Sequence, residues 1–418
     1  MNIGDINIDS LYIGDIKALS GCIGSEVVWW DSGSTPTPPT PPEPVGPPAA
    51  PSGITYSATP LSFLMLEDGY VGLRCMSGVS ATHAADALGQ SKSLDYFIYD
   101  PSGNEISGQT LTISNQNFGQ TELVFVPSGH TISFYAPINE FGQSDQRGLA
   151  SFSGTSLTQL QQYWSFDGFY ASGATRNNTA LVYGNIMSLV LSEDEFDRIY
   201  NFGESFLLDN ITLEPYAFAG LFYVDNYYPS PSLQTPINIV FPSNIEDALV
   251  LPMDDFVSHP VFGIYKMMFY GNLNMTHAPV LPATALWLNC YQNMFSGCMN
   301  LTQAPELPAT TLTASCYSFM FSDCVSLTQA PELPATTLPA QCYSGMFRMW
   351  ESGSSLNYIK CLATSKQSNS TTNWVAGPYT GSIGVSPTGT FIKHPNMTGW
   401  STGHSGIPDG WTVEDAIV

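Results

Sequence analysis

The sequence predicts a mainly β protein with short helices, made of a short N-terminal β segment, a proline-rich linker, a β-sandwich and a repeat solenoid. The main reason is a 26-residue period in the second half of the chain, because fixed periods of this length are typical of stacked repeat units. A ten-residue period at the start of the chain is the second reason. The third is composition: 36 glycines, 31 prolines and only 11% charged residues favour many turns and short strands.

Three copies of a short β-prone run, each ending at a glycine turn, recur every ten residues in residues 1–31. A segment of about 30 residues cannot build its own core. We therefore expect it to be an anchor that packs on another protein; the alternative is a hairpin packed on the chain's own body. The residues that would make these contacts are Ile3, Ile13, Ile23, Trp29 and Trp30.

Residues 32–51 form a proline-rich linker, expected to be an extended and semi-rigid polyproline II spacer. Residues 52–190 then alternate apolar and polar side chains in short runs. Turn signals, such as Asp100-Pro101-Ser102-Gly103 and Pro127-Ser128-Gly129, separate these runs, and the pattern predicts a β-sandwich. The expected strands are Leu61–Leu66, Tyr70–Cys75, Leu94–Tyr99, Thr110–Ile113, Glu122–Val126 and Thr131–Tyr135.

Residues 191–256 are predicted to be an irregular capping region of the solenoid. Ser192 should cap a short helix over Glu193–Tyr200, and Phe218–Phe222 echoes the later repeats. The aromatic loop that follows could contact a ligand, whereas the plainer interpretation is capping structure, since terminal repeats are usually atypical. The candidate surface-binding residues of this loop are Tyr223, Tyr227 and Tyr228.

Residues 257–361 carry the 26-residue repeats. Cys316, Met320 and Cys324 are spaced by four residues, which predicts one face of a short helix in each repeat. Met320 and Phe321 recur in every copy and should point into the core. An extended arm follows the helix, and its two prolines remove backbone donors, which excludes a long regular central strand.

These repeats resemble the BspA-like leucine-rich repeats of Bacteroidota surface proteins, which share the pattern MFxGCxxLTxAPELPATTL. The resemblance covers residues 257–361 and implies a right-handed leucine-rich-repeat solenoid used for adhesion, not an enzyme. The fourth copy departs from the pattern: Trp350 stands where a cysteine would recur and Leu356 comes late, as expected of a terminal coil. Residues 362–418, with three tryptophans, resemble the usual terminus of this family and should form a C-terminal cap.

The recurring cysteines are expected to be buried and reduced. Two cysteines of one repeat would lie roughly 12 Å apart on a helix, which is too far for a disulfide. No CxxC pair or Cys/His cluster supports a metal site, and the sequence predicts no cofactor. The cysteines in question are Cys290, Cys298, Cys316, Cys324 and Cys342.

The charge of the chain excludes some classes of partner. The formal net charge is −24, with 11 Lys and Arg against 35 Asp and Glu, which argues against binding nucleic acid or an anionic membrane through a basic patch. No run of 18 apolar residues is present, so the sequence predicts no membrane insertion.

The start of the chain resembles the IYLGxxxV-type anchor of tail, baseplate and head-fibre proteins from phages of gut Bacteroidota, crAss-like phages included. Together the two resemblances imply a structural protein of the virion surface: a head or tail fibre, with the head slightly favoured over the tail. Its N-terminus would bind capsid or tail proteins, and its repeats would face host cell-surface polysaccharide or protein. We expect a homo-oligomer, a trimer or dimer, and no enzymatic activity.

Two alternatives remain open at this point. The first is a bacterial cell-surface adhesin, which is disfavoured because the start of the sequence has no basic segment followed by an apolar run. The second is a glycan-cleaving fibre, which would need paired carboxylates. The candidate pairs are adjacent acids of the kind that usually cap helices or face solvent. They are Glu193 with Asp194 or Glu195, and Asp254 with Asp255.

Overall fold

The structure is a computed structural model, and it divides into two compact units, Met1–Gly46 and Pro47–Val418. It is mainly β with a few short helices, which confirms the predicted class. The division lies inside the predicted linker. The described residues are six short strands between 2 and 28, and residues 48–75, 91–114, 121–139, 143–144, 166–172, 180–211, 213, 216–224, 239–251, 262–351 and 353–417.

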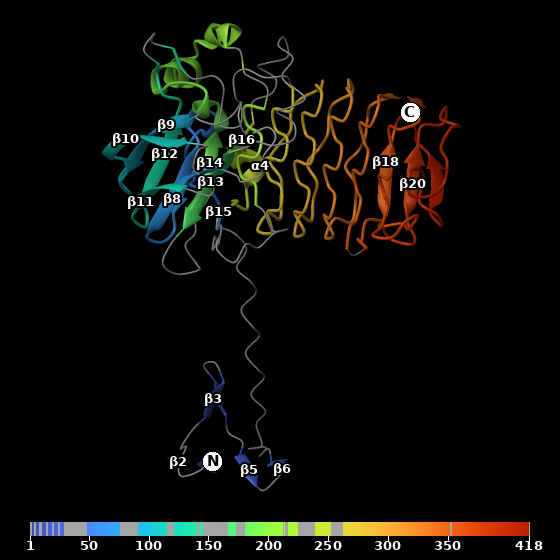
Figure 1. Cartoon of the computed structure of the whole chain (residues 1–418), viewed down its shortest axis with the longest axis horizontal. Coiled ribbons are helices and arrows are strands. Elements are labelled where there is room, and N and C mark those ends of the chain that lie inside the picture. The colour runs from blue at the N-terminus through green and yellow to red at the C-terminus, as the bar shows by residue number, and fades with distance from the viewer. Residues whose placement is uncertain are drawn as a thin grey trace. The chain divides into compact units, whose positions relative to one another are not determined.

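The first unit contains three antiparallel two-stranded pairs at the predicted ten-residue period (Figure 1). The β-prone runs of the sequence are therefore strands. Among the residues that are described, each pair is a two-stranded sheet with no third strand, and isolated two-stranded hairpins are only marginally stable in water. The pairs are β1 (Asn2–Ile3) with β2 (Ile6–Asn7), β3 (Leu11–Ile13) with β4 (Ile16–Ala18), and β5 (Gly21–Ile23) with β6 (Glu26–Val28).

Two β-sheets begin the second unit, and all six strands expected there are present. The larger sheet has the order β10-β9-β12-β7-β14-β15, with β16 also paired to β14. Its strands are β7 (Ser62–Met65), β9 (Ser91–Tyr99), β10 (Glu105–Ser114), β12 (Thr131–Tyr135), β14 (Ala180–Asn185), β15 (Ile239–Val240) and β16 (Leu249–Val250). The smaller sheet has the order β11-β8-β13, from β8 (Gly69–Cys75), β11 (Thr121–Val126) and β13 (Phe166–Ser172).

The expected turns join these strands. The Asp100 carbonyl accepts the Gly103 N–H at 2.9 Å, and the Pro127 carbonyl accepts the His130 N–H at 3.1 Å. Alternating side chains of the strands enter the core, where the rings of Phe63 and Phe134 meet edge to face with centroids 5.9 Å apart. The period-two pattern of the sequence is thus satisfied on the buried side of the larger sheet.

The predicted helix after Ser192 is also present, as α3 (Glu193–Phe196) running into a π-helical turn, η3 (Asp197–Asn201). Ser192 and Glu195 form a capping box, in which each side chain bonds the other residue's backbone N–H. Of the helices that the structure describes, none is long and apolar enough to cross a membrane. The remaining short helices are η1 (Tyr56–Ala58), η2 (Ile186–Leu189), η4 (Ser205–Asn210) and α4 (Ile245–Ala248).

The repeats do not contain the predicted short helices; that prediction is wrong. Residues 288–297 and 314–323 are instead uninterrupted runs of turns. A residue with positive φ occurs at every fourth position, where Asn, Ser, Asp and Gly are frequent because they tolerate the left-handed region. These residues are Asn289, Asn293 and Gly297 in one repeat, and Ser315, Phe319 and Asp323 in the next.

Hydrogen bonding explains why the runs of turns are stable. The N–H groups of even-numbered residues close turns within their own coil. For example, the Met294 N–H donates to the Tyr291 carbonyl at 3.2 Å. The N–H groups of odd-numbered residues donate to carbonyl groups of the next coil. For example, the Phe295 N–H donates to the Met320 carbonyl at 3.0 Å. The backbone polar groups of each run are therefore paired without a helix or a strand, and each coil is bonded to its neighbour.

Two ladders of stacked rings run through the coils and form their core. One contains Phe222, Phe269, Phe295, Phe321 and Phe347, with neighbouring centroids 5.4–5.9 Å apart. The other contains Phe218, Tyr265, Tyr291, Tyr317 and Tyr343, with centroids 5.8–5.9 Å apart. Phe218 and Phe222 stand at the start of the two ladders, in line with the echo of the later repeats in their sequence. Met320 and Phe321 are both fully buried, which confirms their predicted inward orientation.

The last coils differ from the repeats. The period lengthens from 26 to 28 residues after the fourth copy, where Trp350 is exposed and Leu356 is buried. A parallel sheet then forms from β18 (Tyr358–Cys361), β20 (Thr390–Lys393) and β21 (Thr412–Asp415); Figure 1 labels β18 and β20. A separate parallel pair contains β17 (Thr337–Leu338) and β19 (Ser365–Lys366). Trp374 stacks on Tyr343 and on Trp400, so the tyrosine ladder continues into these coils.

The five recurring cysteines are free and buried, as predicted. Two of them donate S–H hydrogen bonds to the preceding coil: Cys298 to the Phe269 carbonyl at 3.1 Å and Cys324 to the Phe295 carbonyl at 3.2 Å. Burial raises the pKa of Cys298 to about 12 and holds the pKa of Cys324 well above its ordinary value. These thiols are packing groups, since a reactive cysteine needs an accessible thiolate.

Candidate binding groove

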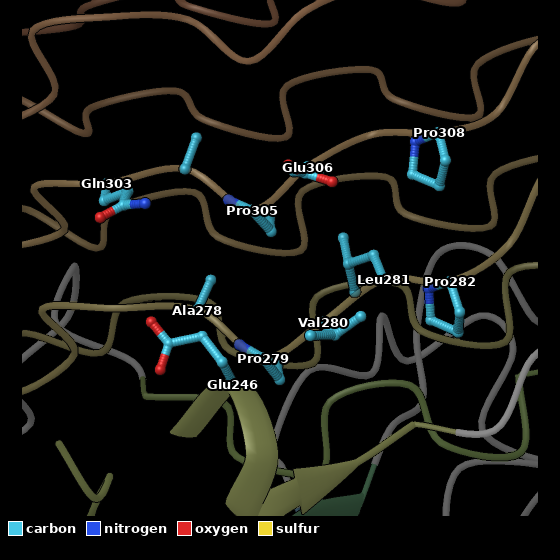
Figure 2. Close-up of a pocket in the computed structure, with 11 residues that line it drawn as sticks. Glu246, Ala278, Pro279, Val280, Leu281, Pro282, Gln303, Pro305, Glu306 and Pro308 are labelled. Carbon is cyan, nitrogen blue, oxygen red and sulfur yellow. The ribbon is translucent and has the colours of Figure 1, made fainter. Parts of the chain in front are cut away.

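The extended arms between the runs of turns line a groove on one face of the coils (Figure 2). Each arm repeats the pattern Ala-Pro-x-Leu-Pro. The leucine is buried and holds the arm on the core, whereas the residue before it is exposed. Val280, Glu306 and Glu332 occupy this exposed position in successive arms. The face of the coils therefore presents one outward side chain per arm between two proline rings.

The groove between the first two arms has a volume of about 420 Å³. Figure 2 shows Pro279 and Val280 on one side, Pro305 and Glu306 on the other, and Glu246 of α4 at one end. A second hollow, of about 360 Å³, lies between the second and third arms. The first groove is more apolar than polar, and Val280, Pro282 and Pro308 are among its accessible apolar residues, whereas the second hollow is about evenly mixed.

The prolines account for the open arms. Within the described residues, no backbone hydrogen bond joins arm 278–283 to arm 304–309, or arm 304–309 to arm 330–335. Proline has no N–H, and two prolines per arm interrupt any ladder between neighbouring arms. The third arm differs, because the proline-free strand β18 pairs with it: Ala330 N–H donates to the Tyr358 carbonyl at 2.9 Å and Leu333 N–H to the Lys360 carbonyl at 3.0 Å.

The groove is acidic as well as apolar. Glu306 is exposed, and neither it nor Glu246 belongs to an ion pair in the described part of the chain. Glu332, one repeat later, contacts Lys360 Nζ at 2.8 Å. Among the described residues, an ammonium group thus contacts the glutamate of the third arm, whereas none forms an ion pair with Glu246 or Glu306.

Only some of the predicted site residues lie in the described part of the chain. Tyr223 is half-buried, and its ring stacks on Tyr270 with centroids 4.9 Å apart, so it packs on the first repeat. Tyr227 and Tyr228 lie outside the described residues, as do Trp29 and Trp30. Ile3, Ile13 and Ile23 lie in β1, β3 and β5, of which the backbone is described.

The adjacent acids proposed as catalytic pairs have structural contacts. Glu195 Oε2 accepts hydrogen bonds from Ser192 N at 3.1 Å, from Ser192 Oγ at 2.9 Å and from Ser144 Oγ. Asp194 lies 4.0 Å from Arg198 in an exposed pair, and burial, followed by nearby carboxylates, raises the pKa of Glu193. Asp254 and Asp255 lie outside the described residues. Within the described ranges, no three His, Cys, Asp or Glu side chains come together as a metal site requires.

Comparisons of the chain with protein-family models, curated proteins and solved structures found no match. The groove therefore has to be interpreted from its own chemistry. Sequence reasoning overlooked it, although the signal was present: a pair of prolines recurring at the same place in every repeat. The prolines limit the length of any strand, and by the same lack of N–H groups they leave neighbouring arms unpaired with a groove between them.

Proposed function

We propose that this chain is a structural protein of a phage virion, a fibre bound to the particle through residues 1–31. Attachment to the head is favoured over attachment to the tail. In this proposal residues 52–190 are a β-sandwich, and the coils are a solenoid of the BspA-like leucine-rich-repeat type. The repeat domain would contact polysaccharide or protein on the surface of a gut Bacteroidota host. The fibre would be a homo-oligomer, a trimer or dimer, with no enzymatic activity.

The observation that carries this proposal is the contrast between the two compact units. The described residues of the first unit form three two-stranded pairs, and the second unit has an extensive core. Strand pairs with open edges gain stability by pairing with strands of another protein. Such a segment is suited to attachment, and the capsid or tail proteins of the virion are the partners that its resemblance to fibre anchors suggests.

The coils support a role in adhesion. Their core is continuous from Phe218 to Trp400 through stacked rings, so the coils form a rigid support for exposed side chains. The arms present rigid grooves on one face. Neither the capping carboxylate of Glu195 nor the exposed pair of Asp194 with Arg198 is arranged as an acid and base across a glycosidic bond. Binding without cleavage is the function that these features favour.

The proposal is tested by proteomics on purified intact virions, combined with cross-linking. We expect the chain to be present at a fixed number of copies per particle, with cross-links from residues 1–31 to a capsid protein. Cross-links to tail proteins would show that the fibre is attached to the tail and not to the head. Absence from purified virions, with the chain recovered from bacterial membranes, would support the adhesin alternative and contradict the proposal. Release of reducing sugars from host capsule would indicate the glycan-cleaving alternative.

A further inference from the structure

We propose that the first groove binds an extended, lysine-containing peptide segment of a host-surface protein, with a lysine ammonium group on Glu306. This inference rests on the adhesive role proposed above and assigns it a ligand class. The groove is the one defined by Glu246, residues 278–282 and residues 303–308.

The chain itself contains a template for this contact. At the third arm, β18 lies alongside residues 330–333 and places Lys360 Nζ 2.8 Å from Glu332. Glu306 is the equivalent of Glu332 one repeat earlier, but the next arm offers it Glu332, which is already paired with Lys360. Lys360 approaches Glu332 from the side of the following coil, and at Glu306 that side is taken by the third arm. The first groove lies on the other side of Glu306, and there a lysine from outside the chain would form the same kind of ion pair.

The shape of the groove favours a peptide side chain. Its apolar walls include the exposed side chain of Val280 and the rings of Pro282 and Pro308, which can pack on the four-carbon stem of a lysine while the ammonium group reaches the carboxylate (Figure 2). Gln303 adds a side-chain amide that can donate and accept hydrogen bonds. A volume of about 420 Å³ accommodates one long side chain with part of its backbone.

Electrostatics exclude anionic ligands from the same place. Glu246 and Glu306 both line the groove, and the chain has a formal net charge of −24. An acidic polysaccharide would meet like charge at close range, whereas a basic segment would be attracted during its approach. Because the carboxylates are exposed, the attraction should weaken as salt screens it.

The test uses the purified full-length chain and a fluorescein-labelled peptide of alternating prolines and lysines, followed by fluorescence anisotropy at low and at physiological salt. We expect binding that weakens with salt, and loss of binding when norleucine replaces each lysine. Glu306→Gln should weaken binding by roughly fivefold, the scale of one exposed ion pair. Glu351→Gln makes the same change of net charge at an exposed position outside the groove, and it should leave binding unchanged.

Three results would overturn the proposal: no binding at low salt, equal weakening by Glu306→Gln and Glu351→Gln, or binding of a glucosamine oligomer in preference to the peptide. The last result would assign the groove to an amino-sugar polymer. Circular dichroism melting of both variants establishes that they are folded. Failure of the proposed function has a different readout, because absence of the chain from virions would leave the peptide measurement unaffected.

Discussion

The β-sheets of residues 62–185 and the repeat coils of residues 262–347 differ in how they pair their backbone N–H and C=O groups while burying apolar side chains. In the sheets, backbone groups pair between strands, and side chains alternate with a period of two. In the coils, successive N–H groups alternate between a turn of their own coil and a carbonyl of the next coil. Side chains four residues apart then share a face, as Tyr317 and Phe321 do. Apolar spacing of four residues is thus not specific to helices.

The largest expected difference between the two regions is their loss of stability at alkaline pH, which should be greater in the coils. Burial raises the pKa of Cys298, Cys316 and Cys361 to about 12, above the unfolded value of about 8.5. A raised folded pKa contributes stability that is complete below the unfolded pKa and is lost as pH rises through the folded pKa. Each thiol should cost about 1.4 kcal/mol per pH unit above about pH 9. Burial also holds the pKa of the other described thiols, Cys290, Cys324 and Cys342, above the ordinary value, so their costs add in the same direction.

Hydrogen exchange followed by mass spectrometry, in reducing buffer between about pH 8 and pH 10 and corrected for the intrinsic exchange rate, measures this effect region by region. Protection of residues 288–347 should fall much more than protection of β9 and β12. The double variant Cys298→Ala and Cys324→Ala provides the control, because its pH dependence should be shallower. Equal loss of protection in both regions would contradict the assignment of the effect to the thiols.

The next largest effect should come from the ring ladder. Phe321 stacks on Phe295 and Phe347, with centroids 5.7 and 5.9 Å away, and it is fully buried. Phe321→Ala should lower the free energy of unfolding by about 3–5 kcal/mol. Phe125 of the smaller sheet is half exposed and touches Tyr70 edge to face, so Phe125→Ala should cost about 1 kcal/mol or less. Urea unfolding of the two variants gives the comparison, and equal costs would contradict the interior position of the ladder.

A smaller effect distinguishes turns from helices by its sign. In a helix, Gly345→Ala would stabilise the chain by about 1 kcal/mol. In the structure Gly345 has φ +62°, and an added Cβ would lie 2.2 Å from the Phe319 ring, so the change should destabilise it by about 2 kcal/mol. Gly381 has φ +78° with nothing within 4 Å, so Gly381→Ala isolates the backbone strain. Thermal unfolding of both variants tests this. If Gly345→Ala stabilised the chain, the result would favour a helix over the run of turns.

The sequence predicted the sheets better than the coils for a physical reason. Strand alternation in residues 61–135 has one structural solution when turn signals such as Asp100–Gly103 limit its length. The four-residue spacing of Cys316 and Met320 fits either a helix or a run of turns, and both structures bury the two residues. Their inward orientation was therefore correct even though the helix was wrong. The residues that decide between the solutions are those at positive φ, such as Asn289 and Asn293, which helix interiors disfavour.

The groove could be predicted only in part. The prolines of the Ala-Pro-x-Leu-Pro arms are visible in the sequence, and their lack of N–H groups implies unpaired arms. The contribution of Glu246 is not visible there, because α4 precedes the repeats and reaches the groove only through the fold. The pairing of Lys360 with Glu332 is hidden too, since the period changes between them from 26 to 28 residues.

The central claim is that residues 1–31 attach the chain to a particle and contribute nothing to the stability of the rest. The most direct test removes these residues and supplies the truncated chain to infected cells alongside the phage, with the full-length chain as control. We expect the truncated chain to melt at the wild-type temperature and to be absent from purified particles, whereas the full-length chain is incorporated. Incorporation of the truncated chain at wild-type copy number would contradict the claim, and a large loss of thermal stability would favour packing of the segment on the chain's own body.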